Sequence, residues 1–198
     1  MALMELKRAP IEGAHIRLEP VVEAMRDDMR AMVAGDPEAW AILLTNGQGD
    51  DFDGYFAAMC GPEADPNRIA FGVRRIADGR LAGTTSFYDI APRHGTVEIG
   101  GTYYRADARG TMVNPEAKYL LLDHAFSNGA HRVQLRTDLR NTRSQAAIEK
   151  LGAKKEGVIR RQFVTWTGHR RDSVVYSILA EEWPEVRSGL ERRLGRAF

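Results

Sequence analysis

The sequence has little cysteine and no long apolar run. Cys60 is the only cysteine among 198 residues, so an intramolecular disulfide and a cysteine-based metal cluster are both excluded. The first ten residues lack the apolar core of a signal peptide, and no stretch approaches the roughly 18 consecutive apolar residues of a membrane helix. These absences predict a cytoplasmic protein that is neither secreted by that route nor membrane-spanning.

Positive charge is missing from one long interval. No Lys or Arg occurs between Arg30 and Arg68, and the whole chain has a formal net charge of +1. The acidic residues of this interval are Asp36, Glu38, Asp50, Asp51, Asp53, Glu63 and Asp65. An acidic segment beside a basic remainder suits an enzyme with a cationic substrate and an anionic cofactor, although a solvated acidic loop region has the same composition.

Several motifs of cofactor, metal and nucleic-acid binding are also absent. The chain contains neither the Walker pattern G-x-x-x-x-G-K-[ST] nor the dinucleotide pattern G-x-G-x-x-G. The histidines have no mutual metal spacing, so no metal site is expected; they are His15, His94, His124, His131 and His169. The near-zero net charge and the lack of an aromatic-basic face argue against an RNA-binding module, so no nucleic-acid partner is expected.

Hydrophobic periodicity and turn signals predict one α+β domain over residues 1–198. Strands are predicted at 15–20, 69–76, 81–90, 96–104 and 131–139, and as a hairpin over 153–180 that turns at Thr167-Gly168. Helices are predicted at 21–34, 53–60, 114–127, 142–152 and 181–194. We expect a mostly antiparallel sheet of six or seven strands, in which only the helix-linked strands 96–104 and 132–138 run parallel.

The segment RGTMVNPEAK begins as a loop and runs directly into a helix. Asn114 suits an N-cap, Pro115 suits the first helical position, and Glu116 favours the positive end of the helix dipole. The free N–H groups of residues 110–114 then form a phosphate site, to which Arg109 could add charge. The same residues would also serve merely to start a helix.

Three segments share their order and spacing with a known enzyme family. They are TVEIGGTYY (96–104), ARGTMVNPEAK (108–118) and DLRNTRSQAAIEKLGA (138–153). Together they resemble the GNAT acetyltransferase superfamily, and in particular the Rim-type branch that acetylates N-termini of ribosomal proteins. The resemblance covers nearly the whole chain and implies the GNAT fold, with acetyl-CoA as cofactor and an amine as acceptor.

The resemblance implies positions for coenzyme A. The residues implied to hold its pyrophosphate through backbone N–H groups are Arg109, Gly110, Thr111, Met112, Val113 and Asn114. The strand end Thr102-Tyr103-Tyr104 is implied to splay from strand 132–138 and to pair with the pantetheine arm, and Asn141 to bind the pantetheine near the thioester. Met112 replaces an expected glycine, and we predict that its φ is negative and its side chain turns away from the ligand. Asn114 tolerates left-handed geometry.

The resemblance also implies two catalytic groups. Glu98 would take the proton of the amine through water, but it could instead pair with Arg74 or Arg136 across the sheet. Ile148 occupies the position where many relatives place a tyrosine that protonates the leaving thiolate. Ser144 is the alternative acid, and its competing role is a helix cap.

The residues that would bind the acceptor are less well defined by the sequence than those that would bind the cofactor. Trp40, Tyr55 and Phe56 lie in the acidic interval and could either line a substrate groove or belong to the core. The function predicted is acetyl transfer from acetyl-CoA to a primary amine, on a protein N-terminus or a small molecule. The alternative is a non-catalytic acyl-CoA-binding or regulatory protein on the same fold. The C-terminal hairpin and helix could form a homodimer interface, but their apolar residues could equally cover the domain's own sheet.

Overall fold

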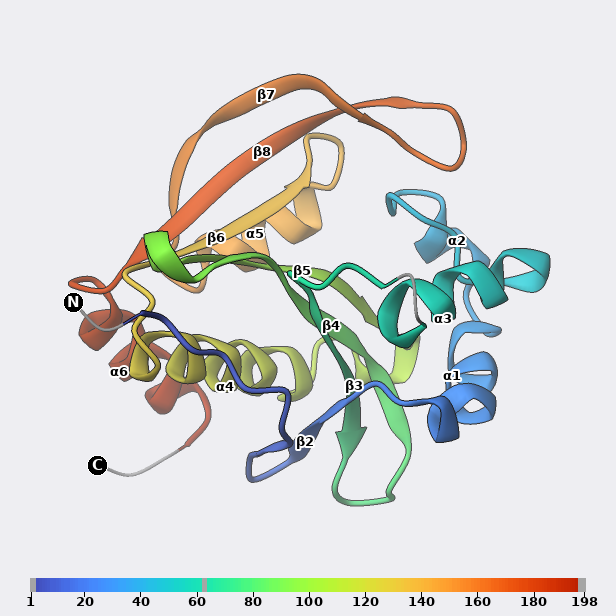
Figure 1. Ribbon diagram of the computed structural model, residues 1–198, viewed down its shortest axis with the longest axis horizontal. Coiled ribbons are helices and arrows are strands. Elements are labelled where there is room, and N and C mark those ends of the chain that lie inside the picture. Colours follow the sequence, from blue (N-terminus) through green and yellow to red (C-terminus); the bar gives the residue numbers. More distant parts are fainter. Residues whose placement is uncertain (1–2, 62–63, 196–198) are drawn as a thin grey trace.

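The computed structural model describes residues 3–61 and 64–195, and its strands form a single sheet. The strands are β1 (Ile11–Glu12), β2 (Ile16–Pro20), β3 (Ile69–Arg75), β4 (Leu81–Ala91), β5 (Thr96–Tyr104), β6 (Arg132–Asp138), β7 (Lys154–Val164) and β8 (Arg170–Leu179). Their order across the sheet is β1-β2-β3-β4-β5-β6-β8-β7 (Figure 1). The sheet therefore has eight strands rather than six or seven, because the two-residue β1 is too short to leave a periodic pattern.

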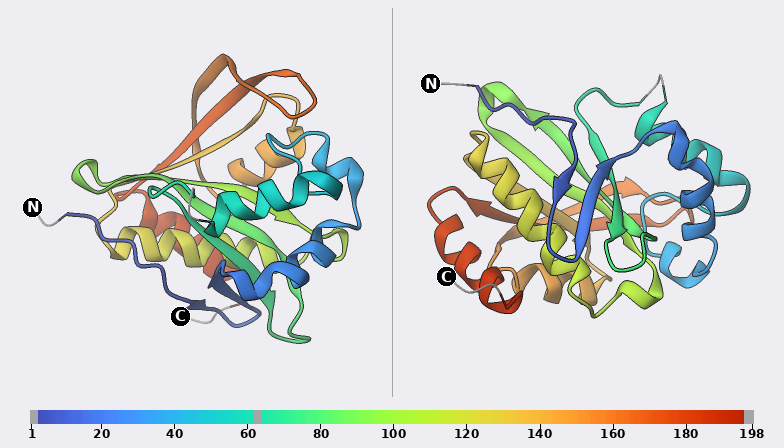
Figure 2. Two further views of the ribbon diagram at one scale, coloured as in Figure 1. Left: turned by 45° about the vertical axis from the view of Figure 1, so that its right-hand side comes forward. Right: turned by 90° about the horizontal axis from the view of Figure 1, so that it is seen from below.

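Helices cover both faces of the sheet. They are α1 (Arg26–Val33), α2 (Pro37–Trp40), α3 (Phe52–Cys60), α4 (Val113–Ser127), α5 (Thr142–Glu149) and α6 (Trp183–Arg193). The views in Figure 2 show α4 and α6 on one face and α1 to α3 on the other. Each of the five predicted helices overlaps an observed one, although the helix predicted at 21–34 is divided into a 3-10 turn at Glu23–Met25 and α1. The short helix α2 was not predicted. None of the helices within the described ranges is long and apolar enough to cross a membrane.

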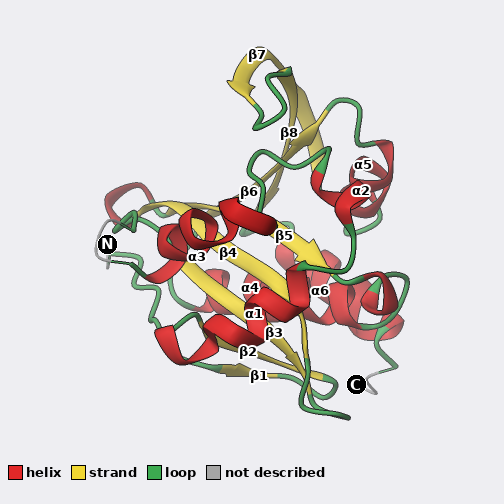
Figure 3. Ribbon diagram, turned by 90° about the vertical axis from the view of Figure 1, so that its right-hand side faces the viewer, coloured by secondary structure: helices red, strands yellow, loops and turns green. Residues whose placement is uncertain are grey.

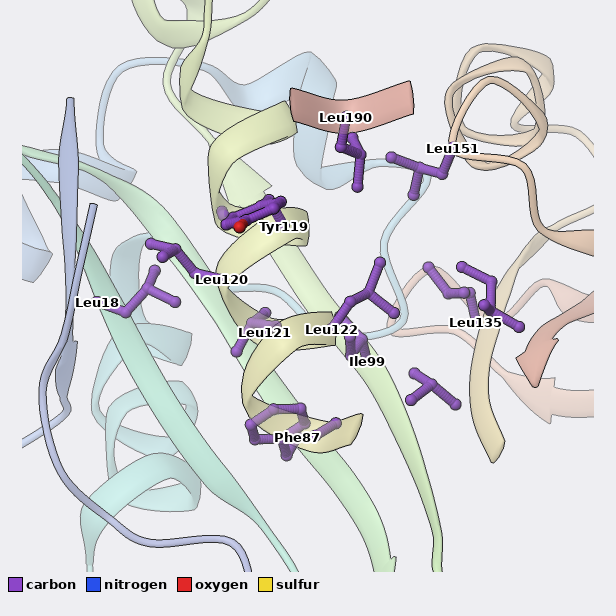
Figure 4. Close-up of a cluster of buried hydrophobic side chains, with 14 of the residues drawn as sticks. Leu18, Phe87, Ile99, Tyr119, Leu120, Leu121, Leu122, Leu135, Leu151 and Leu190 are labelled. Atoms are coloured by element: carbon purple, nitrogen blue, oxygen red, sulfur yellow. The ribbon is translucent and has the colours of Figure 1, made fainter. Parts of the chain in front are cut away.

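Each face of the sheet has its own apolar core. The larger core packs Leu120, Leu121 and Leu122 of α4 against Phe87 and Ile99 of the sheet (Figure 4). The smaller core joins α1 to α3 with the opposite face and includes Trp40, Phe56 and Tyr103, whereas Trp183, Val186 and Leu190 of α6 belong to the larger one. The apolar side of the C-terminal helix therefore covers the protein's own fold.

The sheet opens in its middle, between β5 and β6. These two strands are parallel and pair only at Thr96↔Arg132, Val97↔Val133 and Glu98↔Gln134. Beyond this point β5 continues beside β4 and β6 continues beside β8, so the two strands lose each other's hydrogen bonds. The predicted parallel, splayed pair is confirmed, and a V-shaped opening separates residues 99–104 from residues 135–138.

A kink in β5 accompanies the opening. The register with β4 shifts between Thr84 and Ser86, where Gly101 and Thr102 lie opposite the single residue Thr85. Gly101 has φ +55, and a Cβ there would lie 2.5 Å from the Tyr88 hydroxyl oxygen. Only glycine meets both requirements. As a result, Glu98 faces the α1–α3 side of the sheet, whereas Thr102 turns toward α4.

Candidate active site

The loop before α4 presents unused backbone donors. Gly110 has φ +75, and Met112 has φ −72 with 36% of its surface exposed. Within the described residues, the N–H groups of Gly110, Thr111 and Met112 donate to no protein acceptor. These donors stand at the positive end of a 15-residue helix, which is an arrangement that binds phosphate groups. The predicted negative φ of Met112 is confirmed, and its backbone needs no glycine.

The helix starts earlier than the sequence predicts. Its N-cap is Met112, and Asn114 and Pro115 are the second and third helical residues. The prediction that Asn114 is the N-cap is therefore wrong, and Asn114 does not adopt a positive φ. The reason is local: the Thr111 hydroxyl accepts the Val113 N–H at 3.3 Å and donates to the Ala108 carbonyl at 2.7 Å. This turn starts the helix before Asn114 can cap it.

Glu116 holds the beginning of α4 against the N-terminal strands. Its carboxylate is fully buried and accepts the backbone N–H groups of Ala14, His15 and Ile16 at 2.6, 2.8 and 3.1 Å. A Cβ at Gly13 would lie 2.7 Å from the Glu116 carboxyl group. The residue therefore fixes the loop between β1 and β2 in addition to lying in the first helical turn.

Arg109 is already engaged by the protein. Its Nε donates to the Tyr104 carbonyl at 2.8 Å, and a terminal nitrogen lies 2.5 Å from the Asp36 carboxylate. This pairing connects the acidic interval to the loop before α4. It also neutralises much of the charge that Arg109 would offer to a pyrophosphate. An anion bound at this loop would therefore be held mainly by hydrogen bonds from the backbone N–H groups.

A buried amine lies on the α4 side of the opening. Lys118 Nζ donates to the Thr102 hydroxyl at 2.9 Å, and the Thr102 and Thr85 hydroxyls lie 3.0 Å apart. Burial lowers the pKa of Lys118 to about 8. Sequence reasoning missed this residue, although it ends the motif RGTMVNPEAK. Tyr104 is also buried on this side, and its hydroxyl has no partner within the described residues.

Glu98 lies on the opposite face of the opening and is 7% exposed. Its carboxylate forms an ion pair with Arg136 and accepts the Gln134 amide at 3.0 Å. Arg136 also donates to Asp89 at 2.8 Å. Burial raises the pKa of Glu98, and the Arg136 charge opposes that rise. The predicted arginine pairing is confirmed for Arg136; Arg74 binds a different carboxylate.

The helix after β6 places Asn141 and Ser144 near the same opening. The Asn141 side chain accepts the Ser144 N–H at 2.9 Å and is the N-cap of α5. The capping role considered for Ser144 is therefore taken by Asn141, and the Ser144 hydroxyl makes no hydrogen bond within the described residues. Ile148 is buried in the larger core.

The aromatic residues of the acidic interval belong mainly to the smaller core. Trp40 is buried and stacks on Tyr103 at 4.5 Å between ring centroids. Tyr55 packs edge-on against Trp40, and its hydroxyl lies 3.0 Å from the Thr84 hydroxyl. Burial raises the pKa of Tyr55 to about 12. These rings therefore pack in or against the smaller core rather than line an exposed groove.

Several carboxylates of the acidic interval already have partners among the protein's own side chains. Asp53 lies 2.8 Å from Arg26 and 2.7 Å from Arg30, and Asp51 accepts the Asn46 amide. The carboxylates of Asp36, Asp51 and Asp53 thus have partners within the protein. This leaves less unpaired negative charge for a cationic acceptor than the composition of the interval indicates.

Known proteins share this sequence pattern and fold. Residues 15–154 match the family model described as an acetyltransferase (GNAT) domain. Over 112 residues the chain is 33% identical to the probable N-acetyltransferase YjcK of Bacillus subtilis (strain 168), which covers 55% of this chain. The matched part spans only 60% of that relative's length.

Solved structures extend the similarity to nearly the whole chain. A putative acetyltransferase from T. thermophilus is 38% identical, with a TM-score of 0.85 over 96% of this chain and 100% of that one. Mycobacterium smegmatis RimJ, solved in complex with CoA-disulfide, has the same fold at 19% identity, with a TM-score of 0.75 over 94% of this chain and 93% of that one. Since the family model covers well over half of the sequence and the sheet has the expected splayed pair, this protein belongs to the GNAT acetyltransferase family.

Proposed function

We propose that this protein transfers an acetyl group from acetyl-CoA to a primary amine, on a protein N-terminus or a small molecule, by direct attack on the thioester. The observation that carries the proposal is the opening between β5 and β6. Unused backbone donors lie beside it on the α4 side, and a buried carboxylate faces the other side. A cofactor bound through this opening would meet the acceptor near Glu98.

The residues of the opening fit coenzyme A. Gly110, Thr111 and Met112 offer free N–H groups for its pyrophosphate. The edge of β5 at Thr102–Tyr104 has no strand partner on the β6 side, so its backbone would pair with the amide groups of the pantetheine arm. When bound, acetyl-CoA supplies the activated acetyl group. A backbone N–H of the same edge would stabilise the negative charge on the thioester oxygen.

Glu98 and Ser144 are proposed to move the two protons. The amine must be neutral to attack, and the buried carboxylate of Glu98 would accept its proton through a water molecule. Arg136 and Gln134 hold that carboxylate in place. The hydroxyl of Ser144 has no partner among the described residues and would protonate the departing thiolate, with the amide of Asn141 binding the pantetheine nearby. We further propose that this chemistry takes place in the cytoplasm, within a single domain.

A panel of peptides and small amines, assayed by thiol release from acetyl-CoA, tests the proposal. Acetyl transfer should appear with at least one acceptor and should depend on Glu98. The non-catalytic alternative predicts acetyl-CoA binding with no thiol release for any acceptor. A calorimetric titration with acetyl-CoA on the same preparation separates this outcome from a protein that has lost the cofactor site.

A further inference from the structure

Arg171 lies on the same face of the sheet as Glu98. Alternate residues of β8 point to opposite faces, and Val174, Tyr176 and Ile178 belong to the core around α4. Arg171 and Ser173 therefore point to the other face, toward α1–α3. β8 pairs with β6 (Figure 3), and β6 carries Arg136 and Gln134, which both contact Glu98.

Arg171 is a buried cation without a partner. It is 9% exposed, yet its guanidinium makes no hydrogen bond and no ion pair within the described part of the chain. Its Nε is fully enclosed and has no hydrogen-bond partner among the described residues. The contact that it does make is with the Phe163 ring, 5.9 Å from the guanidinium carbon. Burying an unpaired charge costs free energy, so such a group normally has a counter-charge.

The neighbouring arginines do have counter-charges. Arg136 pairs with Glu98 and Asp89, and Arg140 pairs with Asp138. The carboxylates around Arg171 are thus already engaged. Burial lowers the pKa of Arg171, and the charges of Asp138 and Glu98 oppose that change, which shows that these carboxylates lie within electrostatic range. They do not lie within hydrogen-bonding distance of its guanidinium.

A second buried polar atom lies beside it. The hydroxyl of Ser173 is fully buried and has no partner among the described residues. Ser173 pairs in register with Asp138 and is two residues from Arg171, on the same face of β8. Unsatisfied buried polar groups are rare in folded proteins, and the face of the sheet that carries Glu98 has two of them on β8.

We propose that Arg171 binds a carboxylate of the acceptor, so that the substrate is an amine that also carries a carboxylate. This inference rests on the proposed acetyl transfer. A guanidinium donates two parallel hydrogen bonds to a carboxylate, which also orients the molecule. With its carboxylate on Arg171, the acceptor would present its ammonium group toward Glu98. The carboxylate could belong to a free α-amino acid or to an acidic side chain close to a peptide N-terminus.

Matched acceptor pairs test the inference. The first arm compares L-amino acids with their carboxamides. The second arm compares tripeptide amides that begin with Ala-Asp with those that begin with Ala-Asn, and acetyl-CoA is saturating throughout. We expect kcat/KM about tenfold or more higher for the carboxylate member in one arm, which identifies the source of the carboxylate. Arg171→Met should remove this preference by raising KM, while leaving the neutral member and acetyl-CoA binding unchanged. Arg171→Lys, which keeps the positive charge, should retain part of the preference that Arg171→Met loses.

Two controls separate binding from folding. Arg170→Met removes an exposed arginine one residue away and should leave the preference intact. The Tm of Arg171→Met should be unchanged or higher, because an unpaired buried charge is removed. Equal kcat/KM for both members of every pair in the wild type would overturn the inference. So would an equal loss for both members in Arg171→Met.

A binding measurement distinguishes this inference from the proposed function. N-acetyl-amino acids and their amides are titrated into the protein in the presence of coenzyme A, without any turnover. Binding of the carboxylate form that is lost in Arg171→Met supports the carboxylate site even when no amine is acetylated. Absence of that binding, together with acetyl transfer to neutral amines, would overturn the site and leave the acetyltransferase proposal standing.

Discussion

The buried Lys118 shows how one side chain can link the cofactor site to stability. Burial lowers the pKa of its amine to about 8, from the ordinary lysine value of about 10.5 that applies in the unfolded chain. Between these pH values the unfolded chain binds more protons, so the free energy of unfolding rises with pH. The hydrogen bond to Thr102 offsets part of the cost of burying this amine below pH 8.

Replacing Lys118 with Met should remove that pH dependence. Relative to the variant, the wild type should gain roughly 2 kcal/mol of unfolding free energy between about pH 7.5 and pH 9.5. Urea unfolding at both pH values measures the difference, and titration of other groups cancels because it is common to both proteins. If the free energy of unfolding changed by the same amount between the two pH values in both proteins, the amine of Lys118 would not be desolvated.

At the scale of an element, the beginning of α4 depends on Glu116. Its carboxylate accepts the backbone N–H groups of Ala14, His15 and Ile16 at the beginning of β2; the hydrogen bond of Ile16 is buried and the other two are partly buried. Glu116→Ala leaves these donors unsatisfied and should lower the free energy of unfolding by about 3 kcal/mol or more. Glu116→Gln keeps one acceptor oxygen and should cost clearly less. Chemical denaturation of both variants tests the order, and an Ala variant as stable as the Gln variant would contradict it.

The loop before α4 is proposed to bind acetyl-CoA through its backbone. Gly110→Val places a branched residue at φ +75 and should weaken acetyl-CoA binding about tenfold or more, whereas Met112→Gly should tighten it or leave it unchanged. Gly79→Val is a matched control, because Gly79 has φ +69 in the turn between β3 and β4. Calorimetry should show loss of affinity for the Gly110 variant but not for the Gly79 variant. Equal effects of both would indicate general destabilisation.

At the scale of the whole molecule, local signals predicted most of the sheet. Strands β3, β4, β5 and β6 match their predicted ranges within one residue at each end, because alternation and the Asp78-Gly79 turn are local features. The helix start was misplaced because a hydroxyl three residues earlier competes with Asn114. Local patterns also carry no information on burial by distant segments, so Lys118 and Arg171 were not identified.

The proposed acceptor side is assembled from parts that are distant in sequence. The tip of the β7–β8 hairpin extends over α2 in Figure 1, where Trp166 Nε1 donates to the Trp40 carbonyl at 2.8 Å. The backbone N–H of Trp166 also donates to the Leu44 carbonyl at 3.1 Å. A contact between residues so far apart along the chain leaves no periodic signal, which is why the family motifs revealed the cofactor side earlier than the acceptor side.

The role of Glu98 needs to be separated from its ion pair with Arg136. Arg136→Gln keeps the carboxylate but removes the charge that opposes the raised pKa of Glu98. In that variant the acid limb of the pH profile should move to higher pH while activity survives on its alkaline side. If Glu98 served only the ion pair, loss of either partner would have the same effect on the rate.

The most direct measurement is the pH profile of kcat for the wild type and Glu98→Gln, with acetyl-CoA saturating and the best acceptor from the amine panel. If Glu98 is the base, the variant should bind acetyl-CoA with unchanged affinity and turn over roughly 100-fold more slowly below the pKa of the amine. The two rates should converge above that pKa, where the amine is already neutral. Equal rates for both proteins across the whole pH range would contradict the account.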